Sequence, residues 1–368
     1  MKFQRIVIKL GTSTLTAGTA NLSTPRIVDL VRQISQLHEL GYDLALVTSG
    51  AIAAGRERLN FPALPKDIPV KQMLSAIGQP RLMALYEQLF GLYDLKIGQV
   101  LLTRADLSDR RRYLNSRNTL EALLSQKIVP IINENDTVAT EEIRVGDNDN
   151  LSALVANLIE ADLLMLLTDQ AGLYSADPRS NPGARLIKEV TTVEILDEIW
   201  QAAGSSASHL GTGGMITKLQ AADLARRSGS MVVIAPGSEA DVLLRVANGE
   251  AVGTRFTPVS TALESRKRYL LAGGNATDSL LVDNGAARAL RKSGSLLPVG
   301  VVRANGKFER GDVVSVLDEN NSEIARGLTN YSAVELARIR GCHSSEIESI
   351  LGYTYNEEVI HRNNLVLL

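Results

Sequence analysis

Short apolar runs recur along the first two thirds of the chain, and amphipathic stretches separate them. Six runs rich in Val, Ile and Leu predict strands, at residues 5–10, 43–48, 97–103, 128–132, 163–168 and 231–235. Because these runs are apolar throughout instead of alternating with polar residues, they are typical of a sheet that is buried on both faces.

The segment between the first two strands has the pattern of an amphipathic helix. Thr24 and Pro25 suit its cap and first position, apolar residues follow at helical spacing, and Gly41 ends it. This order of strand, helix and strand continues to about residue 256. It predicts an α/β fold, a mainly parallel sheet sandwiched by helices, whose ligands bind beyond the carboxyl ends of the strands.

The pattern changes after Phe256. The segment TPVSTALESRKRY is polar and rich in turn residues, and beyond it Gly and Asn separate the short strand patterns LLPVGVV, GDVVSVLD and EIARGLTNYS. We therefore predict an α/β domain over residues 1–257, a linker over 258–276 and a small β-rich domain over 277–368.

Composition narrows the class of protein. With 368 residues, 45% of them hydrophobic and 22% charged, the chain predicts a soluble globular protein of more than one domain. A single cysteine, Cys342, excludes an internal disulfide, and the four histidines are too scattered to predict a metal site. The sequence shows neither a signal-peptide pattern nor about 18 uninterrupted apolar residues, so we expect a cytoplasmic protein.

Two clusters of Asn and Asp, NEND at 133–136 and GDNDN at 146–150, follow the apolar run IVPII. Amide and carboxylate groups can hold the ammonium and carboxylate of an amino acid, and a carboxylate can also orient a lysine. The alternative is a polar surface hairpin, because Asn, Asp and Gly are common turn residues. The two clusters alone do not separate these interpretations.

The first two predicted strands each end at a glycine-containing turn, LGTS and TSGA. Glycine lets a ligand approach the backbone, and free amides at a helix N-terminus attract anions. The residues concerned are Lys9, Gly11 and Thr12 after the first strand, and Ser49, Gly50 and Ala51 after the second. The alternatives are a lysine that extends from a strand end and a close-packed strand-to-helix turn.

Two later segments repeat this arrangement. Thr168 and Asp169 end the most apolar strand, although an Asp in this position can also simply cap the next turn. A glycine-rich helix start then supplies Thr212, Gly213, Gly214, Met215 and Lys218. Its spacing is neither that of a P-loop nor that of a dinucleotide fold, so it is a weak motif by itself.

Together these segments are expected to bring two lysines, several glycine-rich turns and the Asn/Asp clusters to one edge of the sheet. Phosphoryl transfer depends on such positioning and charge neutralisation and asks for little covalent chemistry from the protein. The sequence suggests no Ser-His pair and no reactive cysteine beside a glycine turn, which disfavours nucleophilic catalysis.

Six segments, in this order and spacing, resemble the amino acid kinase superfamily and, within it, the glutamate 5-kinase family. They are IVIKLGTS, VTSGAIAAG, INENDTVA, VGDNDNLSA, LLTDQAGLYSADPRSNP and GTGGMITK. The later stretch GSLLPVGVVRANGKFERGDVVSVLDENNSEIARGLTNYS resembles a PUA domain. The resemblance covers nearly the whole chain, apart from the stretch GSSASHL, which matches no motif.

The resemblance implies transfer of the γ-phosphate of ATP, accompanied by Mg²⁺, to the side-chain carboxylate of L-glutamate in proline synthesis. Lys9 and Lys218 would neutralise the transferring phosphoryl group, and Asp149 would orient both lysines. The residues implied for glutamate are Ser49, Gly50, Ala51, Asn133, Asp136, Asp147 and Asn148. Those implied for the nucleotide are Lys9, Gly11, Thr12, Thr168, Asp169, Thr212, Gly213, Gly214, Met215 and Lys218.

The family also implies a homo-oligomer and inhibition by proline, and no dedicated metal site beyond the Mg²⁺ that arrives with the nucleotide. From Arg266 onward 13 Lys and Arg face 12 Asp and Glu, a net charge of +1. A strongly basic patch is therefore not predicted in the PUA-like domain, and RNA binding is less favoured than a regulatory or oligomer-shaping role.

Two other functions stay open. A related kinase acting on carbamate, N-acetylglutamate or aspartate would keep the lysines and glycines but differ at the Asn/Asp clusters. A non-catalytic amino-acid sensor or RNA-binding protein would more readily have lost Lys9, Asp149 or Lys218, and all three are present.

Overall fold

The computed structural model describes residues 3–61, 63–65, 67–139, 148–178, 180–204, 214–261 and 278–368. The chain divides into two compact units. The first comprises Met1–Leu107 and Arg117–Ala262, and the second comprises Ser108–Ser116 and Leu263–Leu368. The candidate chemistry of the sequence falls in the first unit.

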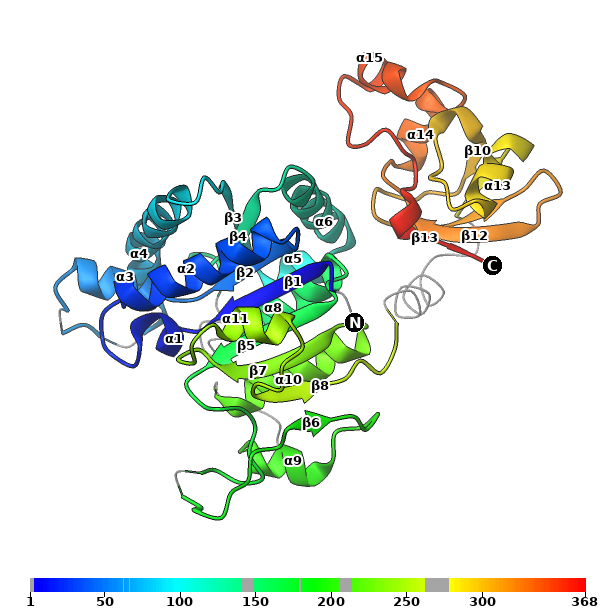
Figure 1. Ribbon diagram of the computed structural model, residues 1–368. Coiled ribbons are helices and arrows are strands. Elements are labelled where there is room, and N and C mark those ends of the chain that lie inside the picture. The colour runs from blue at the N-terminus through cyan, green and yellow to red at the C-terminus, as the bar shows by residue number, and fades with distance from the viewer. Residues whose placement is uncertain are drawn as a thin grey trace. The chain divides into compact units, whose positions relative to one another are not determined.

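An eight-stranded sheet forms the centre of the first unit, with strand order β3-β4-β2-β1-β5-β7-β8-β6 (Figure 1). Its strands are β1 (Arg5–Leu10), β2 (Asp43–Thr48), β3 (Ile97–Leu102), β4 (Val129–Glu134), β5 (Leu163–Thr168), β6 (Glu189–Val190), β7 (Met231–Pro236) and β8 (Thr254–Phe256). Six of the described strand pairings are parallel, and only β7 with β8 is antiparallel. This confirms the predicted α/β class with a mainly parallel sheet.

The bounds of β1, β2 and β5 are those predicted, whereas β4 extends beyond its prediction. β4 continues through Asn133 and Glu134, which pair with Leu101 and Leu102 of β3. The apolar pattern ends at Ile132, but pairing between backbones does not require apolar side chains. Asn133 is therefore the penultimate residue of a strand and not part of a following turn.

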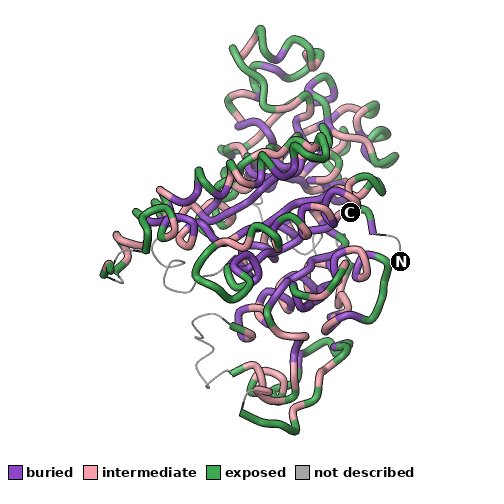
Figure 2. Tube along the Cα trace, turned by 60° about the vertical axis from the view of Figure 1, so that its left-hand side comes forward, coloured by how far each residue is buried: buried purple, intermediate pink, exposed green. Residues whose placement is uncertain are grey.

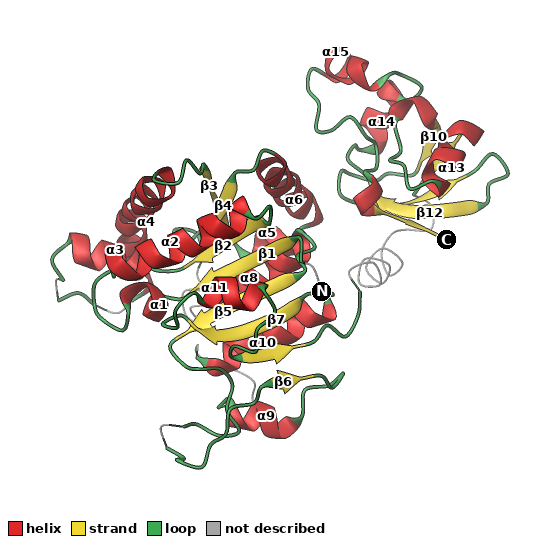
Figure 3. Ribbon diagram, viewed as in Figure 1, coloured by secondary structure: helices red, strands yellow, loops and turns green. Residues whose placement is uncertain are grey.

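Helices cover both faces of this sheet (Figure 3). The helices between residues 12 and 247 are α1 (Thr12–Thr16), α2 (Thr24–Glu39), α3 (Ala51–Arg58), α4 (Ile68–Gly91), α5 (Arg104–Ser108), α6 (Arg110–Ser125), α8 (Asn148–Leu158), α9 (Asp197–Ala202), α10 (Met215–Arg227) and α11 (Val242–Ala247). Burial follows the central strands, as Figure 2 shows. None of the helices in the described part of the chain is long and apolar enough to cross a membrane.

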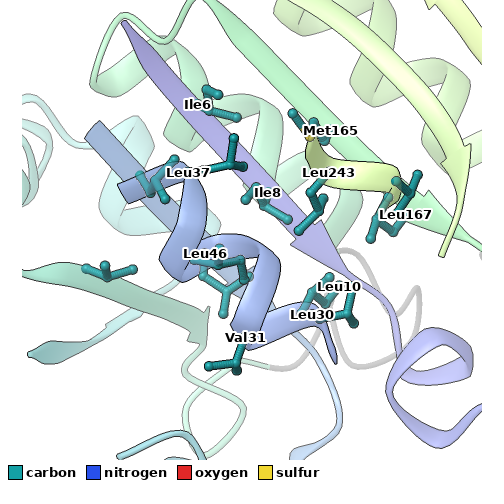
Figure 4. Close-up of a cluster of buried hydrophobic side chains, with 14 of the residues drawn as sticks. Ile6, Ile8, Leu10, Leu30, Val31, Leu37, Leu46, Met165, Leu167 and Leu243 are labelled. Carbon is teal, nitrogen blue, oxygen red and sulfur yellow. The ribbon is translucent and has the colours of Figure 1, made fainter. Parts of the chain in front are cut away.

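The two faces of β1 have different partners. The even-numbered Ile6, Ile8 and Leu10 belong to a buried apolar cluster with side chains of α2, α11 and neighbouring strands (Figure 4). Side chains of α4 belong to the same cluster. Successive side chains of a strand point to opposite faces, so Lys9 points to the other face, where α8 packs against β1. This alternation directs the only charged side chain at the end of β1 toward α8.

Helices α3 and α4 cross unusually closely, at Gly55 and Gly78. A Cβ atom on Gly78 would lie 1.8 Å from the backbone oxygen of Ala51, and one on Gly55 would lie 2.0 Å from that of Leu74. Only glycine permits this approach, since both distances are far below van der Waals contact. The contact fixes the middle of α4 beside the N-terminal turn of α3.

The second unit contains a five-stranded sheet with strand order β10-β9-β11-β12-β13. Its strands are β9 (Ser279–Val282), β10 (Val301–Asn305), β11 (Val313–Leu317), β12 (Glu323–Leu328) and β13 (Leu365–Leu367). Its helices are α13 (Asn284–Arg291), α14 (Ala333–Ile339) and α15 (Ile347–Leu351), with 3-10 turns at Pro298–Gly300, Ser344–Glu346 and Arg362–Asn364. A separate apolar cluster fills this unit, which confirms the predicted small β-rich domain.

Candidate active site

Asp149 lies between two lysines at the carboxyl-terminal edge of the large sheet. Its Oδ1 is 2.6 Å from Nζ of Lys9, and its Oδ2 is 3.2 Å from Nζ of Lys218. Thr217 donates a hydrogen bond of 2.7 Å to Oδ2. The side chains of Asp149 and Lys9 are about 95% buried, so these charges interact with little screening by water. We call Lys9, Asp149 and Lys218 the lysine–aspartate cluster.

Three different elements supply this cluster. Lys9 is the penultimate residue of β1, Asp149 is the second residue of α8, and Lys218 is in the first turn of α10. α8 packs against β1 and also against α10. The segment GDNDN therefore enters a helix at its last three residues and does not form a surface hairpin there.

The electrostatics of the cluster keep Asp149 ionised. Burial by itself raises the pKa of the Asp149 carboxyl, but the charges of Lys9 and Lys218 and the hydrogen bonds it accepts lower the pKa to about 2. Burial lowers the pKa of the Lys218 ammonium, and Asp149 opposes this effect. Asp149 is thus a permanent counterion at neutral pH and a poor proton acceptor.

A second group of polar side chains adjoins Asp149 through Asn148, and it consists of Gln79, Asn133 and Asn148. Asn148 Nδ2 lies 2.8 Å from the backbone oxygen of Thr48, 2.9 Å from Ser49 Oγ and 2.9 Å from Asn133 Oδ1. Asn133 Nδ2 donates to Gln79 Oε1 at 2.8 Å. We call Gln79, Asn133 and Asn148 the amide cluster, and all three are buried.

Asp136 lies just beyond β4 and is held by α4. Ser75 Oγ donates a hydrogen bond of 2.5 Å to Asp136 Oδ2. Burial raises the pKa of the Asp136 carboxyl, and the hydrogen bond from Ser75 acts against that rise. Asp136 is half-buried, so its carboxylate is available to a cationic group.

The predicted glycines occupy crowded or left-handed positions. Gly50 precedes α3 with φ of 100°, a conformation that other residues rarely adopt. A Cβ on Gly11 would lie 3.3 Å from Lys9 Nζ, so a larger residue there would crowd the lysine–aspartate cluster. Thr12 opens α1 and is exposed, and Ala51 opens α3 and is buried.

The residues predicted for the nucleotide are only partly described. Thr168 ends β5, is buried and donates to Asp169 Oδ1, while Asp169 is exposed. Gly214 precedes α10 with φ of 93°, and Met215 is the first residue of that helix. Asp147, Thr212 and Gly213 lie outside the described residues.

The sequence pattern did not indicate Ser75, Gln79 or Thr217 as site residues. Ser75 and Gln79 are four residues apart, so they share one face of α4, and that face meets the end of β4. Thr217 precedes Lys218 and binds the same carboxylate oxygen. The sequence offered one signal for Ser75 and Gln79, namely two polar residues four positions apart beside Gly78. This spacing is also common on helices whose polar face is solvated, so it does not by itself predict a site.

Comparisons with known proteins cover both units. The amino acid kinase family pattern matches residues 4–235, and the PUA domain pattern matches residues 278–351. A glutamate 5-kinase of Photobacterium profundum is 55% identical over 366 residues, which is 99% of this chain and 96% of that protein. The chain belongs to the glutamate 5-kinase family. This confirms the family that the six motifs indicated.

A second glutamate 5-kinase agrees with this assignment. The glutamate 5-kinase of Herpetosiphon aurantiacus is 55% identical over 98% of this chain and 98% of that protein. Among solved structures, a UMP kinase from Bacillus anthracis is 15% identical with a TM-score of 0.48, covering 71% of this chain and 98% of the other. The glutamate 5-kinase relatives match the chain almost from end to end, including the PUA domain.

Proposed function

We propose that this protein transfers the γ-phosphate of ATP to the side-chain carboxylate of L-glutamate, forming L-glutamyl 5-phosphate in the first step of proline synthesis. The observation that carries the proposal is the lysine–aspartate cluster, in which one buried carboxylate holds two lysines. The naming of its near full-length relatives as glutamate 5-kinases supports the choice of substrate.

The electrostatics of the cluster suit phosphorylation of a carboxylate. A glutamate side chain, with a pKa of about 4.3, is already ionised at neutral pH, so the attacking oxygen needs no general base. The barrier to overcome is repulsion between this anion and the phosphate, which two cations reduce. Because the pKa of Asp149 is about 2, its role is to orient Lys9 and Lys218 and not to accept a proton.

We assign the substrates to two sets of residues on this basis. Glutamate is proposed to bind Ser49, Gly50, Ala51, Asn133, Asp136, Asp147 and Asn148. The nucleotide is proposed to bind Lys9, Gly11, Thr12, Thr168, Asp169, Thr212, Gly213, Gly214, Met215 and Lys218. The carboxylate of Asp136 and the amides of the second cluster supply the charge and the hydrogen-bonding groups that a zwitterion needs.

Mg²⁺ is proposed to arrive with the nucleotide and to neutralise phosphate charge when bound. No group of three or more metal-ligating side chains occurs among the residues that the structure describes. Asp149, the most buried acidic side chain of the site, is already engaged by two lysines. The chain would contribute cationic side chains to the phosphates, and an ion bound with the nucleotide would neutralise further phosphate charge.

The remaining expectations are proposals of the same kind. We propose a catalytic domain over residues 1–257, a linker over 258–276 and a PUA domain over 277–368, in a cytoplasmic homo-oligomer inhibited by proline. For the PUA domain, the net charge of only +1 from Arg266 onward favours a regulatory or assembly role over RNA binding.

The test is ADP formation from MgATP with L-glutamate, L-aspartate, N-acetylglutamate or carbamate, each with and without proline. Hydroxylamine traps any acyl phosphate as a hydroxamate. We expect hydroxamate with glutamate alone, and less of it when proline is present. Turnover with another acceptor would reassign the substrate, and no turnover with any acceptor would favour a non-catalytic amino-acid sensor.

A further inference from the structure

Two hydrogen bonds to the backbone fix the orientation of the side-chain amides in the amide cluster. The backbone oxygen of Thr48 can only accept, so the atom of Asn148 that faces it is Nδ2. The backbone nitrogen of Glu134 can only donate, and it lies 2.9 Å from Asn133, so the atom there is Oδ1. Neither asparagine can reverse its amide without losing a hydrogen bond to the backbone.

These two constraints determine the orientation of Gln79. With Oδ1 of Asn133 occupied by Glu134 and Asn148, Nδ2 of Asn133 must donate, and Oε1 of Gln79 accepts it at 2.8 Å. Gln79 also lies on the segment of α4 that is fixed against α3 at Gly78. The backbone position of Gln79 is thus fixed, and its Oε1 accepts the hydrogen bond from Asn133 Nδ2.

The arrangement leaves two buried polar atoms unused. Asn148 Oδ1 and Gln79 Nε2 have no hydrogen-bond partner among the residues that the structure describes. The first is an acceptor and the second a donor, and both residues are about 92% buried. Unpaired buried polar atoms are costly, so the unpaired Oδ1 of Asn148 favours a ligand that brings a hydrogen-bond donor. An amino acid, with its ammonium and carboxylate, is such a ligand.

We propose that Gln79 is a positioning residue for the amino-acid substrate. Its Oε1 holds Asn133, and Asn133 holds the Asn148 amide so that Oδ1 remains available to accept a hydrogen bond from the substrate ammonium. This inference rests on the proposed function, because it assumes that the amino acid binds beside Asn148. Gln79 acts through Asn133 and does not take part in phosphoryl transfer.

The test replaces Gln79 by methionine, which keeps the length of the side chain and removes the acceptor. We expect KM for glutamate to rise about tenfold to a hundredfold, the loss expected for one hydrogen bond to a charged group. Both kcat and KM for MgATP should stay within about twofold, because the lysine–aspartate cluster is untouched. Gln79→Glu keeps an accepting oxygen for Asn133 and should raise KM for glutamate less than Gln79→Met does.

Gln33 provides a matched control. It is a fully buried glutamine of α2 that also uses both ends of its amide, donating to Asp29 and accepting from the backbone nitrogen of Leu243. Gln33→Met should lower the melting temperature without changing KM for glutamate. If Gln79→Met and Gln33→Met have the same KM, the positioning role is wrong although glutamate phosphorylation stands.

A pair of polar variants decides the matter if Gln79→Met does not fold. Asn133 is itself proposed to bind glutamate, so Asn133→Asp alone should raise KM, but Gln79 can turn its amide and donate to the new carboxylate. Asn133→Asp combined with Gln79→Glu instead opposes two carboxylates. The double variant should therefore raise KM by more than the product of the single effects, and simple multiplication would refute the contact. If the unaltered chain does not phosphorylate glutamate, the proposed function fails, and calorimetric titration of L-glutamate into the same variants tests the positioning role separately.

Discussion

Replacing Asp149 by asparagine removes the counterion of two buried lysines and changes little else in shape. Asparagine still offers an acceptor to Thr217, so the main change is the loss of one negative charge. Lys9 and Lys218 would then face each other across a site from which water is largely excluded. We expect both the stability of the first unit and the turnover to fall.

The pKa of the Asp149 carboxyl gives a lower value for the loss of unfolding free energy, and the pKa of a lysine ammonium gives an upper limit. Lowering the pKa of Asp149 from 3.8 to about 2 corresponds to about 2 to 3 kcal/mol of stabilisation, at about 1.36 kcal/mol per pKa unit. An upper limit exists because a lysine without its counterion can lose its proton, which costs about 4 kcal/mol at pH 7.5 for an ordinary pKa of about 10.4. The expected loss of unfolding free energy is therefore about 2 to 4 kcal/mol.

The unfolding free energy should depend on pH differently in the unaltered chain and in Asp149→Asn. In the unaltered chain the folded pKa of Asp149 is depressed, so its contribution is complete above about pH 4 and is lost as the pH falls toward about 2. In Asp149→Asn the pKa of Lys218, which burial already lowers, loses the opposing effect of Asp149 and falls further, so the unfolded chain binds more protons than the folded one. The stability of the variant should therefore rise between about pH 8 and pH 10.

Denaturant unfolding at several pH values, with kcat measured in parallel, tests this reasoning. Asp43→Asn is a matched control, because Asp43 also lies between two cations, 2.7 Å from Lys127 and 3.7 Å from Arg5. Lys127 is 60% exposed, so this change should cost about 1 kcal/mol or less and leave kcat intact. An Asp149→Asn protein as stable and active as the Asp43→Asn protein would show that the buried carboxylate does not hold the lysines.

Three further changes have defined outcomes. Lys9→Ala should lower kcat by about 10² to 10³, as for loss of a preorganised charge donor, and near-native turnover would contradict the assignment. Ser75→Ala removes a hydrogen bond that keeps the pKa of Asp136 down, so the acidic limb of the pH profile of kcat/KM for glutamate should move to higher pH; an unchanged limb would mean that Asp136 does not bind the substrate. Gly78→Ala puts a Cβ 1.8 Å from a backbone oxygen of α3 and should destabilise the protein by about 3 kcal/mol or more. Gly91→Ala, in the same helix but with open space around it, should be neutral or slightly stabilising, and equal melting temperatures for the two variants would refute the close contact.

Much of the fold was determined by the order of apolar runs in the sequence. A parallel sheet buried on both faces requires unbroken apolar strands, so β1, β2 and β5 were predictable to the residue. The same pattern placed Lys9 at a strand end and Lys218 in the first turn of a helix, because strand ends and helix starts have local signals. These signals depend only on neighbours in the sequence.

Only the tertiary structure decided which of these residues meet. The contact between Asp149 and both lysines joins β1, α8 and α10, and in the sequence Asp149 lies 140 positions after Lys9 and 69 before Lys218. The roles of Ser75 and Gln79 depend on the approach of α4 to α3 at Gly55 and Gly78, and a sequence pattern records the glycines without their partners. Local periodicity determines how each segment folds, whereas the hydrogen bonds and charges of the site arise where distant segments pack against one another.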